Sequence, residues 1–255
     1  MKTRLKDSCC IKAVAWDNGG VLVQEDWNGC YDHTYGKLGI VSPLGGDAAR
    51  GKQYKKMLSV PITPEISSQL VTFRHGDSEG NYLQSYGSGH ISSAEFWSVA
   101  CHYGFGVAPT DENVDALRAG QDHLLSNGPG AARIFPRVVE ILAALSAALP
   151  QYMLSNIYPE AYEQLRGAKY LEAIPADHRF FSIFLKCRKP SAAAFEALIA
   201  GTGVAPRGIL FIDDQASNIE AARCCGINGI LFSGERESEQ VLIAGLERFG
   251  IIVSG

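Results

Sequence analysis

The chain has 255 residues, a size that suits one large domain or one domain carrying an insert. Apolar residues make up 46% and the net charge at pH 7 is -4, which provides a sizeable core but no basic surface for nucleic acid. No apolar run approaches the ~20 residues that span a bilayer, and the first residues lack the apolar stretch of a secretory signal. We therefore expect a cytoplasmic globular protein that binds neither membranes nor nucleic acid.

The seven cysteines indicate neither a disulfide framework nor a zinc cluster. Their number is odd, two pairs are adjacent, and no C-x-x-C spacing occurs. We expect reduced thiols that pack as small apolar groups.

An apolar stretch at residues 11–16 predicts the first strand, which runs into Asp-Asn-Gly-Gly at 17–20, a sequence typical of a sharp turn. Between about residues 25 and 130 the hydrophobic periodicity is weaker. Ser92 followed by Glu95 resembles a helix-capping box. The helices expected in this part of the chain span residues 52–58, 65–71, 93–102 and 112–125.

From about residue 134 onward, short apolar strands alternate with helices. Two of the strands end at polar pairs, Ser155 with Asn156 and Asp213 with Asp214. The expected strands span residues 152–154, 180–185, 208–212 and 229–232, and the expected helices begin near residues 136, 159, 191, 218 and 241.

Apolar strands separated by helices indicate a parallel sheet that is covered on both faces. We expect an α/β fold with a Rossmann-like parallel sheet core, formed by residues 1–24 and 131–255. The roughly 100 residues that follow the first strand are too many for one crossover connection. We therefore expect residues 25–130 to form a mostly helical cap domain inserted after that strand.

Polar residues follow several of the predicted strands, at the edge where an open parallel sheet binds its ligands. Asp17, Asp213 and Asp214 would bring carboxylates from two strands into one small volume. Their repulsion would be costly unless a hard divalent cation offsets it, and Mg²⁺ suits a site dominated by oxygen donors. Lys189 and the hydroxyl of Ser155 would add a positive charge and a donor for a phosphate group.

Each of these residues also has a plainer interpretation when it is taken alone. Asp17 in Asp-Asn-Gly-Gly could be a turn former, and Asp213 with Asp214 could be a solvated pair at a helix entry. Lys189 before Pro190 could be a surface lysine. The functional interpretation depends on the whole set occurring together.

This arrangement resembles the haloacid dehalogenase-like (HAD) superfamily, chiefly its phosphatase branch with a helical cap after the first strand. The resemblance covers the first two dozen residues and about 134–253 well, and the cap only loosely. The resemblance rests on four motifs, each at the end of a predicted strand: Trp16–Leu22 (WDNGGVL), Leu154–Asn156 (LSN), Lys189–Pro190 (KP), and Phe211–Asp214 (FIDD) followed by Asn218–Ala222 (NIEAA). The last of these motifs, which Gly226 and Gly229 follow, is the most specific.

The resemblance implies a phosphatase that hydrolyses a small phosphorylated metabolite. It implies that Asp17 is the nucleophile, that it forms an aspartyl phosphate, and that Lys189 neutralises charge on the nucleophile and on the transferring group. Ser155 and the amide of Asn156 would hold phosphate oxygens. The Mg²⁺ ligands would be the Asp17 carboxylate, the Gly19 carbonyl and Asp214, with Asp213 binding directly or through water.

One residue departs from the family pattern. The general acid of the family is an Asp two residues after the nucleophile, and here that position is Gly19. A placed proton donor contributes roughly 10²–10⁴-fold to a rate. We therefore hypothesise a preference for anomeric, acyl or aryl phosphates, whose leaving groups need less protonation, or a proton donor supplied by the cap.

Two other functions are compatible with the same residues. Gly19 would also suit a catalytically weak binding or regulatory protein that keeps the fold. In a haloacid dehalogenase the same Asp would attack carbon, but that reaction needs no metal, and Asp213 with Asp214 argues against it. The substrate and the oligomeric state do not follow from these residues.

Overall fold

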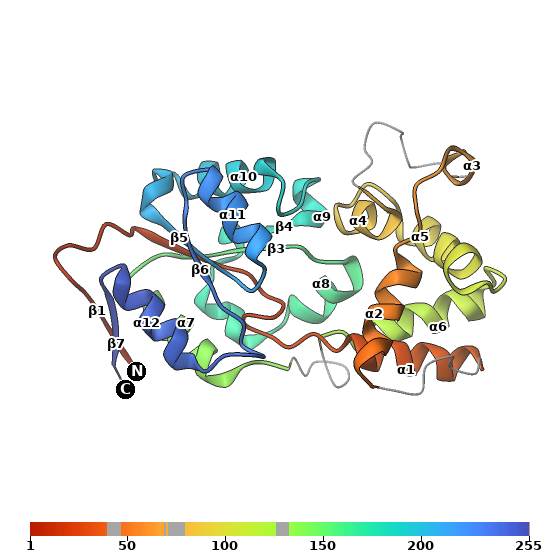
Figure 1. The fold of residues 1–255 in the computed structure, drawn as a ribbon, viewed down its shortest axis with the longest axis horizontal. Coiled ribbons are helices and arrows are strands. Elements are labelled where there is room, and N and C mark those ends of the chain that lie inside the picture. The colour runs from red at the N-terminus through yellow and green to blue at the C-terminus, as the bar shows by residue number, and fades with distance from the viewer. Residues whose placement is uncertain (40–46, 69, 71–79, 126–132, 255) are drawn as a thin grey trace. The chain divides into compact units, whose positions relative to one another are not determined.

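Figure 1 shows the computed structural model of the chain, which describes residues 1–39, 47–68, 70, 80–125 and 133–254. The contacts within the chain divide it into two compact units. The core unit comprises Met1–Gln24, Arg133–Asn156 and Gly167–Gly255, and the helical unit comprises Glu25–Ala132 and Ile157–Arg166. Residues 157–166 therefore group with the helical unit, although the sequence analysis assigned them to the core.

The core unit is built on a five-stranded parallel sheet, as expected from the apolar strands. The strand order is β4-β3-β2-β5-β6, so the first strand of the sheet, β2, lies at its centre. The strands are β2 (Ala13–Trp16), β3 (Gln151–Ser155), β4 (Arg179–Phe181), β5 (Ile209–Asp213) and β6 (Asn228–Leu231).

Helices cover both faces of this sheet, with α10 and α11 on one side and α7 and α12 on the other (Figure 1). Alternate strand residues such as Ala15, Leu154 and Phe211 form one buried cluster with Phe195 of α10 and Ile219 of α11. The residues between them in each strand are buried as well, which explains the continuous apolar runs of the sequence. The helices of the core unit are α7 (Pro136–Ser146), α9 (Ser182–Leu185), α10 (Ala192–Thr202), α11 (Ala216–Cys224) and α12 (Glu239–Arg248).

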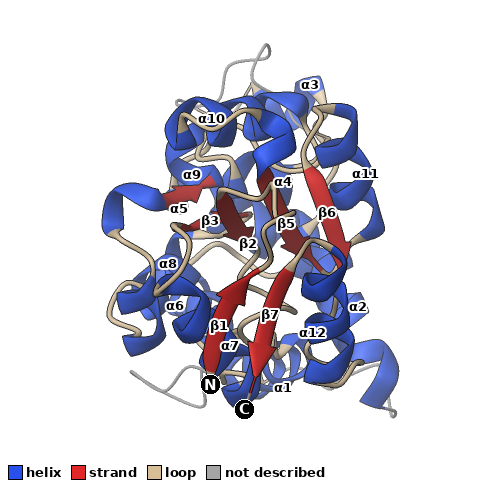
Figure 2. Ribbon diagram, turned by 90° about the vertical axis from the view of Figure 1, so that its left-hand side faces the viewer, coloured by secondary structure: helices blue, strands red, loops and turns tan. Residues whose placement is uncertain are grey.

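The structure differs from the sequence prediction in two parts of the core unit. The expected strand at 180–185 stops at Phe181, and residues 182–185 (Ser-Ile-Phe-Leu) form the one-turn helix α9 instead. A second sheet was not predicted: β1 (Lys2–Leu5) pairs antiparallel with β7 (Ile251–Ser254). Figure 2 shows this ribbon with both chain termini at one end of it.

The helical unit contains short helices, among which α5 begins after Ser92, as the capping pattern predicted. Helix α1 was missed, since it carries Gly, Asn and Thr, which are weak helix formers. No described helix is both long and apolar enough to cross a membrane. The helices are α1 (Trp27–Leu38), α2 (Asp47–Leu58), α3 (Pro64–Ser67), α4 (Tyr82–Gly87), α5 (Ser93–Val99), the π-helix η1 (Ala100–Phe105), α6 (Asp111–Gln121) and α8 (Pro159–Leu165).

A buried carboxylate explains why α8 belongs to the helical unit. Glu160 of α8 accepts hydrogen bonds from the Tyr86 hydroxyl at 2.7 and 2.8 Å, from Nε1 of Trp97 at 2.8 Å and from the Ser93 hydroxyl at 3.2 Å. The guanidinium of Arg118 lies 3.9 Å from the same carboxylate. A buried charge needs such partners, so these contacts attach α8 to α4, α5 and α6.

Candidate active site

The nucleophile candidate and the acidic pair come from adjacent strands. Asp17 directly follows β2, whereas Asp213 is the last residue of β5. The parallel register pairs Trp16 with Ile212, and the Asp17 amide donates to the Ile212 carbonyl at 2.8 Å. Both carboxylates therefore lie at the carboxyl edge of the sheet, where the sequence analysis expected them.

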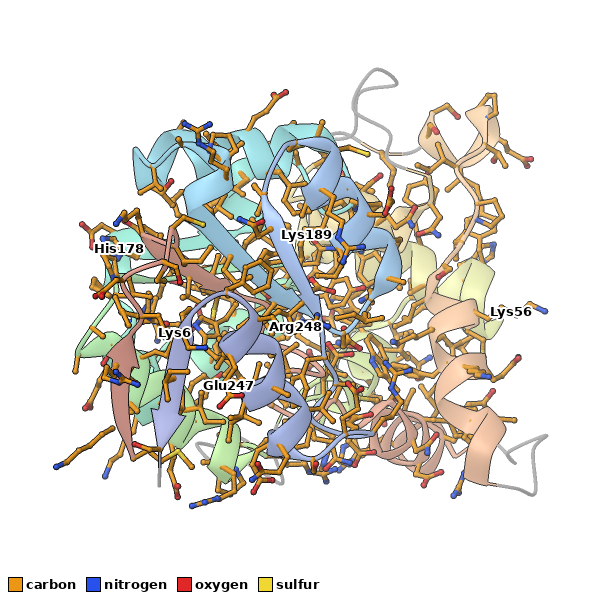
Figure 3. The ribbon with its side chains drawn as sticks, turned by 60° about the vertical axis from the view of Figure 1, so that its left-hand side comes forward. Lys6, Lys56, His178, Lys189, Glu247 and Arg248 are labelled. Carbon is orange, nitrogen blue, oxygen red and sulfur yellow. The ribbon has the colours of Figure 1, made fainter. Side chains whose placement is uncertain are left out.

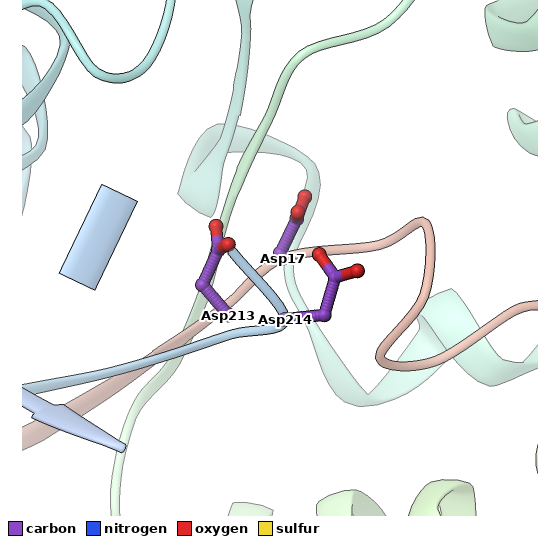
Figure 4. A group of neighbouring side chains, drawn as sticks. All are labelled: Asp17, Asp213 and Asp214. Atoms are coloured by element: carbon purple, nitrogen blue, oxygen red, sulfur yellow. The ribbon is translucent and has the colours of Figure 1, made fainter. Parts of the chain in front are cut away.

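Three carboxylates gather at this edge. Asp17, Asp213 and Asp214 each offer an oxygen atom, and these atoms lie within 4.8 Å of one another (Figure 4). Asp17 and Asp213 are buried, and Asp214 is partly exposed. So short a separation leaves the negative charges strongly coupled unless cations lie among them.

Lys189 supplies one such cation. Its Nζ lies 2.9 Å from Oδ1 of Asp17 and 2.7 Å from Oδ2 of Asp213, and its side chain is 1% exposed. Figure 3 labels it inside the core unit, in contrast to Lys56 at the surface of α2. The interpretation of Lys189 as a surface lysine is therefore wrong.

Burial and like charges dominate the electrostatics of the site. Burial, opposed by Lys189 and reinforced by Asp213 and Asp214, raises the pKa of Asp17 from 3.8 to about 8. Burial alone would lower the pKa of the Lys189 ammonium, but the carboxylates of Asp17 and Asp213 more than reverse this and raise it. The Lys189 ammonium therefore does not offset the cost of burying the Asp17 carboxylate beside Asp213 and Asp214.

Asp213 is held by the helix that follows it. Its Oδ1 accepts from the Gln215 amide at 2.8 Å, and Nδ2 of Asn218 in α11 lies 3.0 and 3.1 Å from its two oxygens. Asn218 is thus a structural residue, and both oxygens of Asp213 already accept hydrogen bonds.

The turn after β2 is wound tightly against Asp214. The Asn18 carbonyl accepts from the amides of Val21, Leu22 and Val23 at 3.3, 2.9 and 3.1 Å. Gly20 has φ +76°, and a Cβ atom there would lie 2.6 Å from Oδ2 of Asp214. The position therefore requires glycine, both for its backbone conformation and for the space that Asp214 occupies.

The serine and asparagine of the second motif lie at the end of β3, the neighbour of β2 in the sheet. Ser155 is the last residue of β3 and is buried. Asn156 follows it, and its side chain hydrogen-bonds to the backbone of Lys189. The structure therefore joins the second motif to the third as well as placing Asp17, Lys189 and the acidic pair together.

Tyr170 is a residue near the site that sequence reasoning missed. It lies in the 3₁₀-helix η2 (Lys169–Ala173), and its hydroxyl donates to Oδ1 of Asn18 at 2.6 Å. Asn18 in turn donates its amide to Oδ1 of Asp17 at 2.7 Å. No pattern in the sequence marks Tyr170, since its partner lies 152 residues away.

The donor set fits a hard divalent cation. The side-chain atoms that could bind a metal ion here are carboxylate oxygens, and the described residues place no histidine or cysteine in the group. Oxygen ligands of this kind suit Mg²⁺. Burial first, and repulsion from Asp213 and Asp214 in addition, raise the pKa of Asp17, and a divalent cation among the carboxylates would oppose this repulsion.

The comparisons with known proteins agree with this geometry. The sequence profile of the haloacid dehalogenase-like hydrolases matches residues 11–226. This chain belongs to that family. The HAD-like hydrolase is therefore an enzyme of a hydrolase family with an α/β Rossmann-like core, as the motifs predicted.

Solved structures show the same fold at low sequence identity. A HAD family enzyme of Bacteroides thetaiotaomicron, bt-2542, solved in complex with magnesium and inorganic phosphate, has a TM-score of 0.61 at 19% identity and covers 91% of this chain and 98% of its own. A HAD-like family hydrolase of Porphyromonas gingivalis has a TM-score of 0.62 at 20% identity, with 94% and 98% covered. The L-2-haloacid dehalogenase of Xanthobacter autotrophicus has a TM-score of 0.54 at 19% identity, with 93% and 83% covered.

One curated relative is similar over a short stretch. Phosphatase MT3486 of Mycobacterium tuberculosis (strain CDC 1551 / Oshkosh) is 31% identical over 67 residues. This stretch is 26% of the present chain and 31% of that protein's length, so the similarity covers about a third of the relative.

Proposed function

We propose that this HAD-like hydrolase is a cytoplasmic, Mg²⁺-dependent phosphatase that hydrolyses a small phosphomonoester through an aspartyl phosphate on Asp17. The observation that carries the proposal is the meeting of Asp17, Asp213 and Asp214 in one group, with the buried ammonium of Lys189 in contact with Asp17 and Asp213. The names of two similar proteins support it, one a phosphatase and the other an enzyme in complex with magnesium and phosphate.

In the first step an oxygen of Asp17 attacks phosphorus while the bond from phosphorus to the leaving-group oxygen breaks. The adjacent ammonium of Lys189 holds this carboxylate in place and offsets negative charge as the phosphoryl group arrives. The hydroxyl of Ser155 and the amide of Asn156 hold phosphate oxygens. Water then attacks the aspartyl phosphate, which releases inorganic phosphate and restores Asp17.

The Mg²⁺ ligands in this proposal are the carboxylates of Asp17 and Asp214 and the carbonyl of Gly19. Asp213 would act through a water molecule, because both of its oxygens already accept hydrogen bonds from protein groups. When bound, the ion supplies positive charge that offsets the charge of the phosphate oxygens. We further propose that the helical unit is the cap that selects the substrate.

The experiment that tests this function is a screen for phosphate release from sugar, nucleotide and acid phosphates, with Mg²⁺ and with chelator. We expect release from at least one ester, and its loss when Mg²⁺ is removed. Binding of phosphorylated ligands without turnover would favour the regulatory function that Gly19 suggests. Chelator-insensitive halide release from a haloacid, without phosphate release, would establish a dehalogenase instead.

A series of substrates with different leaving groups tests separately whether the absence of a side chain at Gly19 limits protonation of the departing oxygen. This residue carries no side chain that could protonate the departing oxygen, so we expect rates to fall steeply as the pKa of the leaving group rises. The measurement is kcat/KM for a series of aryl and alkyl phosphates of graded leaving-group pKa. A missing donor costs roughly 10²–10⁴-fold on the poorest leaving groups. A flat dependence would mean that another residue supplies the proton.

A further inference from the structure

The side chain of Asn156 forms a two-way clamp on the backbone of Lys189. Its Nδ2 donates to the Lys189 carbonyl at 2.9 Å, and its Oδ1 accepts from the Lys189 amide at 2.9 Å. The two residues are 33 positions apart in the chain. One carboxamide thus satisfies both backbone polar groups of a single residue and joins the end of β3 to the segment between α9 and α10.

These two hydrogen bonds fix the position of the Lys189 backbone, from which the Lys189 side chain extends. The ammonium is buried between Asp17 and Asp213, with hydrogen-bond distances to both, so it has little freedom to shift toward either carboxylate. Because the whole side chain is buried, its stem has little room to compensate for a shift of the Lys189 backbone, so such a shift would move the ammonium. A misplacement of about 1 Å in a reacting arrangement can cost 10²-fold in rate.

We infer that the Asn156 side chain is a positioning residue, which acts on the reaction by fixing Lys189 between Asp17 and Asp213. The kinetic consequence of this inference rests on the proposed phosphatase function. The positioning role of the Asn156 side chain is separate from the role proposed for its backbone amide, which is to bind a phosphate oxygen. The side chain acts through Lys189, whereas Ser155 beside it acts on the substrate.

The test compares Asn156→Ala with a matched control in the same unit. Asn228 also donates Nδ2 to backbone carbonyls, those of Arg207 at 2.7 Å and Ile209 at 3.3 Å, but it takes no part in the site. We expect Asn156→Ala to lower kcat about 10–100-fold. Asn228→Ala should keep kcat within about 2-fold, even though it also loses a side-chain clamp.

A double-mutant cycle separates positioning from a general structural role. In a Lys189→Met background, Asn156→Ala should weaken the affinity for inorganic phosphate with Mg²⁺ by less than about 2-fold, because the residue it positions is gone. An equal loss of affinity in both backgrounds would overturn the inference. Asn156→Asp keeps the acceptor for the Lys189 amide but loses the donor to the Lys189 carbonyl. Its kcat should lie between those of the wild type and Asn156→Ala, and it replaces Asn156→Ala in the cycle if the alanine variant does not fold.

A crystal structure of Asn156→Ala, or of Asn156→Asp, keeps this inference distinct from the proposed function. We expect Nζ of Lys189 to move out of hydrogen-bond distance of at least one of the two carboxylates. If Nζ stays bonded to both Asp17 and Asp213, the positioning role is wrong, whatever the activity of the wild type. If Nζ moves but the wild type releases no phosphate, the positioning role stands and the phosphatase function is wrong.

Discussion

Replacing Asp17 with Asn is expected to abolish phosphate release while making the metal-free protein more stable. The amide of Asn is not an attacking oxyanion, so turnover should fall on the order of 10⁵-fold or more. Stability should rise by about 1–3 kcal/mol, because the change removes one of three crowded buried or half-buried carboxylates, of which Asp17 and Asp213 share the Lys189 ammonium. Asn keeps the size of Asp and can still accept from Lys189 through Oδ1.

The pH dependence of stability provides a second measurement on the same variant. The folded-state pKa of Asp17 is raised from 3.8 to about 8, so between these values the folded metal-free protein binds more protons at this residue than the unfolded chain. The contribution of Asp17 to the free energy of unfolding therefore falls as pH rises through that window. The Asp17→Asn protein should not show this part of the fall in the free energy of unfolding with rising pH.

Denaturant unfolding of both proteins in chelator, from pH 5 to 8, measures the difference, and phosphate release with Mg²⁺ measures the activity. Asp7→Asn is the control, since Asp7 is exposed and takes no part in the site. It should change neither quantity. An Asp17→Asn protein with full activity would remove Asp17 from the mechanism, and one less stable than the wild type in chelator would contradict the electrostatic account.

Replacing Lys189 with Met should have the opposite effect on stability and a large effect on activity. Met fills a similar volume, but it leaves the carboxylates of Asp17 and Asp213 buried without the cation that both contact. Removal of one partner from a buried ion pair typically costs about 3–5 kcal/mol. The loss of charge stabilisation during phosphoryl transfer should lower kcat by about 10³-fold.

The free energy of unfolding in chelator, compared with that in saturating Mg²⁺, measures this prediction. Mg²⁺ should restore part of the lost stability, because it also supplies positive charge among the carboxylates. Lys56→Met, at an exposed position of α2, should leave both stability and kcat unchanged. A Lys189→Met protein as stable as the wild type in chelator would mean that the ion pairs do not hold the site together.

The sequence predicted the sheet and the acidic cluster because both depend on local signals. Runs such as 209–212 are buried on both faces of the sheet and therefore lack polar residues, and each ends where the chain leaves the core. Parallel strands bring those ends to one edge, so Asp17 and Asp213 could be placed together from their positions alone.

Other features depend on contacts between distant residues and could not be predicted in this way. Lys2–Leu5 has three polar residues and a single apolar one, which is typical of a loop, and it becomes a strand only because Ile251–Ser254 pairs with it. Residues 182–185, three of which are apolar, fit a strand or a helix equally well, since so short a run has no clear periodicity. The clamp of Asn156 on Lys189 likewise joins segments that no local pattern connects.

The buried carboxylate of Glu160 has a consequence for exchanging caps among related hydrolases. The chain passes between the two units after Gln24, Ala132, Asn156 and Arg166, so the helical unit is assembled from two separate pieces of sequence. A chimera that transplants only residues 25–132 would leave Glu160 behind, without the tyrosine, tryptophan and serine that donate hydrogen bonds to its carboxylate. Successful transfer of substrate preference should therefore require moving residues 157–166 together with 25–132.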